Sequence, residues 1–226
     1  MRFPGSHDRI SIVGATGSGK TQAAIWHLSG MDYETMPWIV YDFKGDELVN
    51  GIPYARHIDV SEIPLKPGIF IVHPMPHQVG TQGTGEVEAQ LWEIHKRGNM
   101  GVYIDEGYMM GRYNAPFRAL LTQGRSKRIP MIVLSQRPVF MDGFVFSESG
   151  FFQMFRLQQP RDIKAVSDWV RFKDRKAREK FETMPEYHSY FFSVKDNEGT
   201  FFSPVSPLEN TYAIFEARLR PVRRVL

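Results

Sequence analysis

The chain has 226 residues, a formal net charge of +3, 42% hydrophobic residues and 23% charged residues. These values are ordinary for a globular protein and favour one α/β domain with additions over two independent domains. The absence of cysteine excludes disulfides and thiolate metal sites. No apolar run approaches the ~18 residues of a membrane span, so we expect a cytoplasmic protein without an intrinsic span.

The first 140 residues alternate between strand and helix patterns. Short apolar runs predict strands over Arg9–Val13, Trp38–Asp42, Gly68–His73, Gly101–Asp105 and Met131–Ser135. Periodic or suitably flanked segments between them predict helices over Thr21–Leu28, Glu86–Arg97 and Ala115–Thr122. Continuous apolar strands that alternate with helices are typical of a mostly parallel sheet with helices on both faces.

Beyond residue 140 this alternation ends. The patterns predict a strand over Phe151–Leu157, helices from Pro160 to about Val170 and over Asp174–Glu182, and a hairpin of Ser189–Val194 with Thr200–Ser203. From Leu208 the pattern is mixed and compatible with a helix, and Arg218–Arg224 is a basic tail. We therefore place a core at residues 1–160 and an extension at 161–226 that completes the same domain with helices, hairpin and tail.

The most informative segment lies between the first strand and the first helix. It fills every position of the phosphate-loop pattern G-x-x-x-x-G-K-S/T with Gly14, Ala15, Thr16, Gly17, Ser18, Gly19, Lys20 and Thr21. Backbone N–H groups of such a loop wrap a triphosphate, and the helix that follows points its positive end at the phosphates. Lys20 is expected to reach the β- and γ-phosphates of ATP, and the Thr21 hydroxyl to bind Mg²⁺.

Two carboxylates follow the fourth predicted strand. Asp105 is positioned to hold the Mg²⁺ water shell, and Glu106 to polarise a water for in-line attack on the γ-phosphate. A water-activating glutamate beside the metal aspartate favours hydrolysis over transfer to an acceptor. Gln136, after the fifth strand, would sense the γ-phosphate if that strand lay between the first and fourth strands in the sheet.

Four features in order resemble the FtsK–HerA superfamily of DNA-pumping ATPases. They are the phosphate loop, the segment Tyr41–Glu47 with its D-x-K-G-D run, the strand ending in Asp105 and Glu106, and the segment Leu134–Pro138. In its compact length the chain is most similar to the genome-packaging ATPases of tailless phages with an internal membrane, such as tectiviruses. The resemblance covers about residues 9–140.

This resemblance implies a RecA-like phosphate-loop NTPase core and a hexameric ring that drives double-stranded DNA through its channel. It also implies ATP bound between subunits, with an arginine of the neighbour stabilising charge on the transferring phosphate. The Gln123-Gly124-Arg125 segment is similar to that of the family, so Arg125 is the candidate, with Arg128 in reserve. Partners would be the portal or vertex proteins of a capsid, reached from the host cytoplasm.

Four further residues are weaker candidates. Asp42 could support the metal site from behind its direct ligands and Lys44 could face a neighbour's nucleotide, although a salt bridge within their turn explains both equally well. Arg112 and Tyr113 follow the catalytic acids and could contact the DNA backbone, because a sequence-indifferent motor needs phosphate contacts.

The function expected from these residues is an ATP-hydrolysing translocase that packages a viral genome into a preformed capsid. One alternative is a small-molecule kinase that acts on nucleosides or nucleotides with the same loop. Another is an ATPase for virion assembly or export, although those relatives usually carry a membrane span. The sequence leaves ring size and the direction of pumping open.

Overall fold

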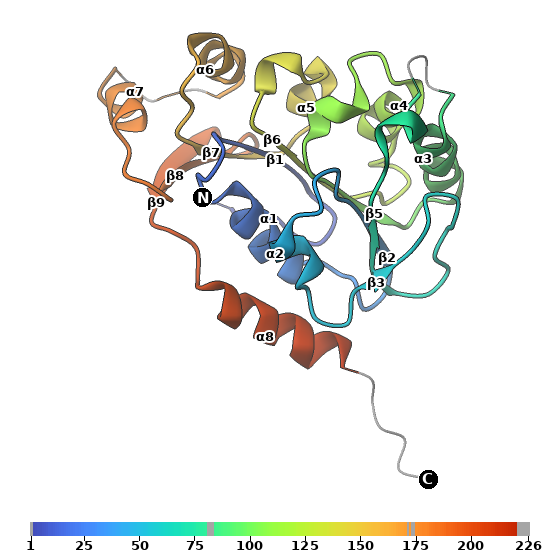
Figure 1. Ribbon diagram of the computed structural model, residues 1–226. Helices are drawn as coiled ribbons and strands as arrows, with labels where there is room; N and C mark the ends of the chain where they lie inside the picture. The colour runs from blue at the N-terminus through green and yellow to red at the C-terminus, as the bar shows by residue number, and fades with distance from the viewer. Residues whose placement is uncertain (1, 81–83, 171, 173–174, 221–226) are drawn as a thin grey trace.

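The computed structural model describes residues 2–80, 84–170, 172 and 175–220. Within these residues one nine-stranded sheet runs through the molecule in the order β3-β4-β2-β5-β6-β1-β7-β8-β9 (Figure 1). The strands are β1 (Arg9–Val13), β2 (Pro37–Tyr41), β3 (Arg56–His57), β4 (Gly68–Val72), β5 (Gly101–Ile104), β6 (Met131–Ser135), β7 (Phe151–Phe155), β8 (Ser189–Ser193) and β9 (Glu198–Phe202). The first seven pair in parallel, whereas β8 and β9 are antiparallel to their neighbours.

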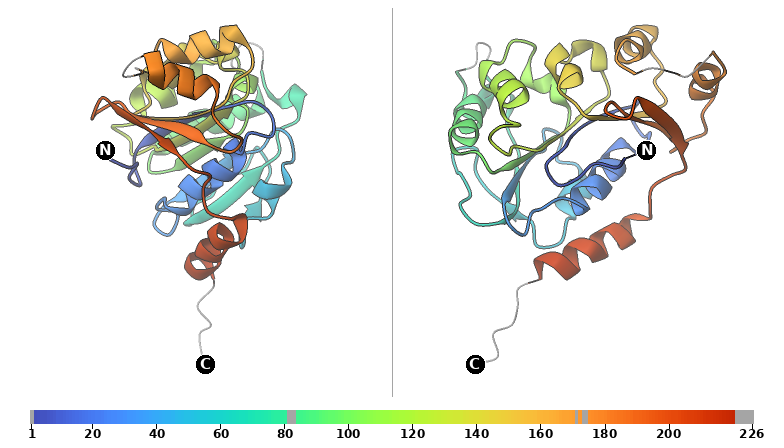
Figure 2. Two further views of the ribbon diagram at one scale, coloured as in Figure 1. Left: turned by 90° about the vertical axis from the view of Figure 1, so that its left-hand side faces the viewer. Right: turned by 180° about the vertical axis from the view of Figure 1, so that it is seen from behind.

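Helices cover both faces of this sheet. They are α1 (Lys20–Ser29), α2 (Glu47–Asn50), α3 (Glu86–Arg97), α4 (Ala115–Gln123), α5 (Gly143–Ser147), α6 (Pro160–Ser167), α7 (Arg175–Glu182) and α8 (Leu208–Leu219). In Figure 1 helices α1, α2 and α8 lie below the sheet and α4 to α7 above it, while Figure 2 shows the same layers from the side and from behind.

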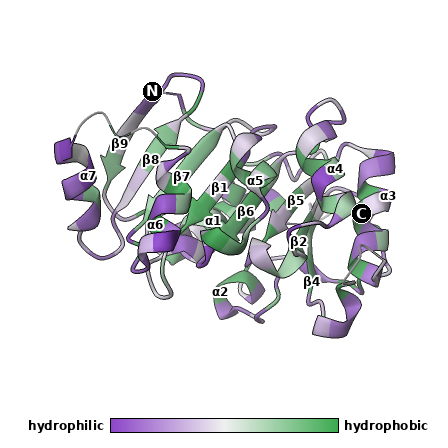
Figure 3. Ribbon diagram, turned by 90° about the horizontal axis from the view of Figure 1, so that it is seen from above, coloured by the Kyte–Doolittle hydropathy of each residue, from purple (hydrophilic) through white to green (hydrophobic). Residues whose placement is uncertain are grey.

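Side chains of the strands alternate between two hydrophobic cores. Ile10 and Ile12 of β1 point to the core shared with α1 and α8, and Val13 points to the core shared with α3, α4 and α5. Every residue of the central strands is buried, and in Figure 3 they form the apolar centre between the more hydrophilic helices α6 and α7 at one end and α3 at the other. The α/β class predicted from the continuous apolar runs is therefore confirmed.

The C-terminal third continues this sheet. Strand β8 pairs with β7 from Phe155↔Ser189 to Phe151↔Ser193, and the predicted hairpin with β9 is formed. Helix α8 packs across α1, and its Phe215 ring lies 5.4 Å from the ring of Tyr33, in the segment that follows α1. Arg218 of the basic tail is held by Glu34 at 2.7 Å, whereas residues 221–224 of that tail lie outside the described residues. The boundary placed at residue 160 stays a prediction.

The sequence patterns did not predict three short elements, β3, α2 and α5. Each is two to five residues long, so periodicity has too few positions to show. Helix α2 depends on its N-cap instead, where the Asp46 side chain accepts a hydrogen bond from the backbone N–H of Leu48. Among the described helices, none combines the length and apolar character that crossing a bilayer requires.

Candidate nucleotide site

The phosphate loop lies at the carboxyl ends of the central parallel strands. Gly17 and Gly19 have φ of 75° and 92°, in the left-handed region that favours glycine. A Cβ on Gly14 would come within 2.6 Å of the Phe155 Cβ, so only glycine fits between the loop and β7. Backbone hydrogen bonds fix the start of the loop, from Gly14 to Ser135 (3.2 Å) and from Ala15 to Arg156 (3.1 Å).

The rest of the loop is open to an anion. Helix α1 begins after Gly19, and no side chain in the described part of the chain caps it, which leaves its first N–H groups and its positive end directed at the loop. The buried Ser18 hydroxyl also has no partner among the described residues. Lys20 is buried at the start of the helix, and this burial lowers its pKa, against the opposing effect of Glu106. A phosphate would supply the counter-charge.

Asp105 lies directly after β5 and is the least satisfied polar group of this region. Its backbone N–H donates to Tyr41 at 2.9 Å, which fixes its position. Both carboxylate oxygens are buried and without a hydrogen-bond partner within the described part of the chain. Burial raises the pKa of Asp105 to about 6, with Lys44 opposing this effect. An unpaired buried carboxylate is costly unless a cation is bound, so the residue fits a divalent ion.

Glu106 is also buried, but both of its oxygens have partners. Oε1 pairs with the Lys44 ammonium, and Oε2 accepts a 3.3 Å hydrogen bond from the Gln136 backbone. Its backbone is left-handed, with φ of 58°, a conformation that is uncommon for glutamate and recurs at functional sites. Burial lowers the pKa of Lys44, but the hydrogen bond and charge of Glu106 outweigh it, and the net pKa is raised.

Strand β6 lies between β1 and β5, which is the condition set above for Gln136. The Gln136 side chain extends from the end of β6 to the phosphate loop, where its Oε1 accepts a hydrogen bond from the Thr16 hydroxyl. A change in the conformation of the loop on nucleotide binding would therefore alter a contact of Gln136 at the end of β6, directly beside Glu106.

Asp42 organises the turn after β2. Its carboxylate accepts backbone hydrogen bonds from Lys44 (3.1 Å) and Asp46 (2.8 Å), and lies 3.4 Å from the His73 ring. Lys44 is thereby directed to Glu106 of its own chain, so its ion pair is not the turn salt bridge with Asp42 considered from the sequence. The Lys44–Glu106 pair had no sequence signal, since 62 positions separate the two residues.

Arg125 and Arg128 lie in the loop between α4 and β6, at the amino ends of the strands. Arg125 borders a cavity with Arg9, the first residue of β1, whereas the phosphate loop follows the last residue of β1. The length of β1, roughly 15 Å at ~3.3 Å per residue, separates the two ends. Arg125 therefore cannot serve the phosphates of its own chain, and its role at a neighbour's site stays a prediction.

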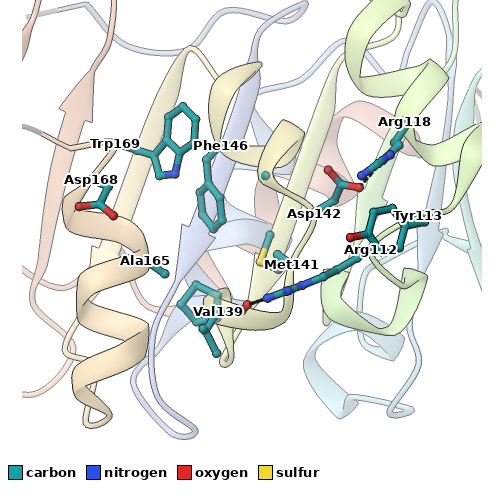
Figure 4. A pocket seen from close by; sticks show the side chains of 12 residues that line it. Arg112, Tyr113, Arg118, Val139, Met141, Asp142, Phe146, Ala165, Asp168 and Trp169 are labelled. Atoms are coloured by element: carbon teal, nitrogen blue, oxygen red, sulfur yellow. Dashed lines mark hydrogen bonds and ion pairs between the residues drawn. The ribbon is translucent and has the colours of Figure 1, made fainter.

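Arg112 and Tyr113 border a cavity of about 380 Å³ on the upper face, between the start of α4 and helices α5 and α6 (Figure 4). The Arg112 guanidinium donates to the Val139 carbonyl, and Tyr113 is 79% exposed under the Arg118 guanidinium, 4.8 Å from its ring centroid. Arg118 itself pairs with Asp142 at 2.5 Å. Contact of Arg112 and Tyr113 with DNA stays a prediction.

Comparison with curated proteins finds a viral ATPase of similar sequence. The chain is 43% identical over 220 residues to the DNA packaging ATPase P9 of Enterobacteria phage PRD1, covering 96% of this chain and 95% of that protein. No family model matches the sequence.

Two solved structures share the fold. The genome packaging NTPase B204 of Sulfolobus turreted icosahedral virus 2, solved with AMPPCP, has a TM-score of 0.68 and 20% identity, covering 89% of this chain and 100% of that one. VirB4 of Thermoanaerobacter pseudethanolicus has a TM-score of 0.63 and 10% identity, covering 88% and 90%. The resemblance predicted from the four motifs is confirmed.

Proposed function

The chain belongs to the family of the phage DNA packaging ATPase P9, and on that premise we propose that it is an ATP-hydrolysing motor that packages a double-stranded viral genome into a preformed capsid. The observation that carries this proposal is the buried Asp105 carboxylate, which has no hydrogen-bond partner among the described residues and lies beside Glu106 and an open phosphate loop. The motor would act at the packaging vertex of a capsid, in the cytoplasm of the host cell.

The position of each residue in the site determines its role in ATP hydrolysis. The loop from Gly14 to Thr21 holds the phosphates through its backbone, and Lys20 neutralises charge on the β- and γ-phosphates. Thr21 and Asp105 would hold Mg²⁺, which supplies further neutralisation of phosphate charge when bound. The described residues include no cluster of three or more acidic or histidine ligands, which suits an ion coordinated mainly by substrate and water.

Glu106 acts as the general base. It takes a proton from a water whose oxygen attacks the γ-phosphorus, while the bond to the β–γ bridging oxygen breaks and ADP leaves with that oxygen. Lys44 and the Gln136 N–H hold the carboxylate at the end of β6. Gln136 contacts both the loop and the region of Glu106, so it is placed to respond to the γ-phosphate.

The assembly we propose is a ring of identical subunits, with six members by resemblance to the superfamily. Arg125 of the adjacent subunit would then complete each nucleotide site. The position of Arg125 at the amino ends of the strands is in keeping with this role. Such an arginine stabilises negative charge in the transition state and is worth about 10³–10⁵ in rate.

The first test measures ATP hydrolysis with and without duplex DNA. The wild type should hydrolyse ATP faster with DNA, Lys20→Ala should lose nucleotide binding, and Glu106→Gln should bind ATP without hydrolysing it. Glu93→Gln, on the exposed face of α3, makes the same chemical change away from the site and should behave as wild type. Normal hydrolysis by Glu106→Gln contradicts the assignment, and phosphate transfer to a nucleoside favours a kinase.

A mixing experiment tests the neighbour's arginine. Arg125→Ala and Glu106→Gln should each be inactive, but a mixture that exchanges subunits should regain activity. Intact glutamate from one variant and intact arginine from the other meet at about one quarter of the interfaces if assembly is random and head-to-tail. A mixture that remains as inactive as its components shows that Arg125 does not act across an interface.

A further inference from the structure

A second pocket lies beside the phosphate loop, on the side away from Asp105 and Glu106. It has a volume of about 290 Å³ and is lined by the loop from Ala15 to Ser18, by Arg156 and Gln158, and by the four residues 185–188. None of the residues from 156 onward was expected at the nucleotide site, because the motifs end near residue 140.

The sheet topology builds the walls of this pocket. Strands β7 and β8 are antiparallel, with Phe155 opposite Ser189, so the chain leaves β7 at the place where it enters β8. One wall is thus the segment after β7, which also binds Ala15 through the Arg156 carbonyl at 3.1 Å. The other wall is the segment before β8, anchored by the buried Met184 and Ser189. Both walls are fixed by the core.

The order of strands also sets the direction of a bound nucleotide. The candidate groups for the γ-phosphate, Asp105, Glu106 and Gln136, follow β5 and β6 on one side of β1. The pocket follows β7 and β8 on the other side of β1. Suppose that the γ-phosphate of a nucleotide lies at Asp105, Glu106 and Gln136 and that its phosphates run along the loop. Its nucleoside end is then directed at the pocket.

Tyr187 is the prominent side chain of this pocket. It is 52% exposed, and its ring lies over the loop, with Cδ1 3.2 Å from where a Cβ on Gly19 would be. Its φ is 61°, a left-handed conformation that is an outlier for a bulky residue. Strain of this kind persists where surrounding structure enforces it, and ligand clamps are common sites. The fixed flanks on both sides of residues 185–188 provide that constraint.

We propose that this pocket binds the base and ribose of the nucleotide, with the Tyr187 ring stacked on the base. The inference rests on the proposed function for the presence of ATP in the loop. The volume of about 290 Å³ lies just below the range of roughly 300–1,000 Å³ for pockets that hold whole ligands, as suits a nucleoside whose phosphates are held elsewhere. Stacking on an aromatic ring accepts any base but gains most from a purine.

The test compares ATP with inorganic tripolyphosphate, which has the phosphates but no nucleoside. By calorimetry, Tyr187→Ala should weaken ATP binding about tenfold, in line with the loss of one base stack, and leave tripolyphosphate binding unchanged. Tyr187→Phe keeps the ring and should bind both ligands as wild type does. Purine triphosphates should bind more tightly than pyrimidine triphosphates to wild type, and this preference should disappear in Tyr187→Ala.

Tyr54→Ala is the matched control. Tyr54 is 45% exposed and has φ of 60°, but it lies in the turn after α2 and should be without effect on either ligand. The proposal is overturned if Tyr187→Ala binds ATP as wild type does, or loses ATP and tripolyphosphate equally. A wild type that binds neither ligand overturns the proposed function and this inference together, whereas a failure confined to Tyr187 leaves the ATPase assignment intact.

Discussion

Replacing Asp105 by asparagine should stabilise the nucleotide-free protein while removing its response to Mg-ATP. The carboxylate is buried, and its two oxygens lack hydrogen-bond partners among the residues described. Its negative charge is therefore a cost that the fold bears in the absence of a cation. Asparagine has nearly the same shape and no charge, so the variant reports the cost of the charge itself.

The size of this cost follows from the pKa. Burial raises the pKa of Asp105 from 3.8 to about 6, and one pKa unit corresponds to about 1.4 kcal/mol. Above pH 6 the charged carboxylate therefore lowers the free energy of unfolding by about 3 kcal/mol. For a chain of this size each kcal/mol changes the melting temperature by about 2–4 °C, so Asp105→Asn should melt about 6–12 °C higher.

The dependence on pH has a defined sign. The folded state binds the proton more tightly than the unfolded state, so the wild type loses this part of its stability as pH rises from 3.8 through 6. Urea unfolding at pH 7.5 should show Asp105→Asn about 3 kcal/mol more stable than wild type, with the difference shrinking toward zero near pH 4.

The same variant should lose the stabilisation that Mg-ATP gives the wild type, because ligand binding raises stability only in a state that binds. Two results would refute the reasoning. One is an asparagine variant that is equally or less stable at pH 7.5, which means that the carboxylate has a favourable partner. The other is an undiminished rise in melting temperature on addition of Mg-ATP.

Three further predictions concern other parts of the structure. Burial lowers the pKa of His27 to about 4, so wild type should lose about 3 kcal/mol of stability relative to His27→Gln as pH falls from 6.5 to 4, measured by urea unfolding. Lys44→Met should lower the free energy of unfolding by about 2 kcal/mol, and most of that loss should vanish in a Glu106→Gln background, as a double-mutant cycle would show. Gly14→Ala should abolish ATP binding in calorimetry because its Cβ collides with a β7 side chain, whereas Gly143→Ala, which has open space around it, should bind normally.

The sequence predicted the centre of the fold well, because the central strands are short, continuous apolar runs that are buried on both faces. The limits of the helix Glu86–Arg97 agree with the structure for a similar reason, since its apolar positions have helical spacing. Where burial does not set a pattern, prediction failed. Strand β3 is only two residues long, and both are exposed.

In the nucleotide site, too, local features could be predicted from the sequence and contacts between distant residues could not. The phosphate loop is a local motif, so its eight residues could be assigned from their order alone. The contacts of Lys44 with Glu106 and of Gln136 with Thr16 join residues that are 62 and 120 positions apart, and only the strand order brings them together. The left-handed backbone of Glu106 and the place of Tyr187 over Gly19 likewise have no local sequence signal.

The location of Arg125 and the phosphate loop at opposite ends of the strands limits the symmetry of any assembly that joins them. In a two-fold dimer the same patch of each copy meets itself, so a donor and an acceptor on different faces cannot both be matched. Head-to-tail contact satisfies them, and it repeats until the rotation closes or a filament results. A filament always ends in one copy whose loop receives no arginine, whereas closure gives every copy a donor. Full catalytic occupancy would thus be a property of the closed assembly.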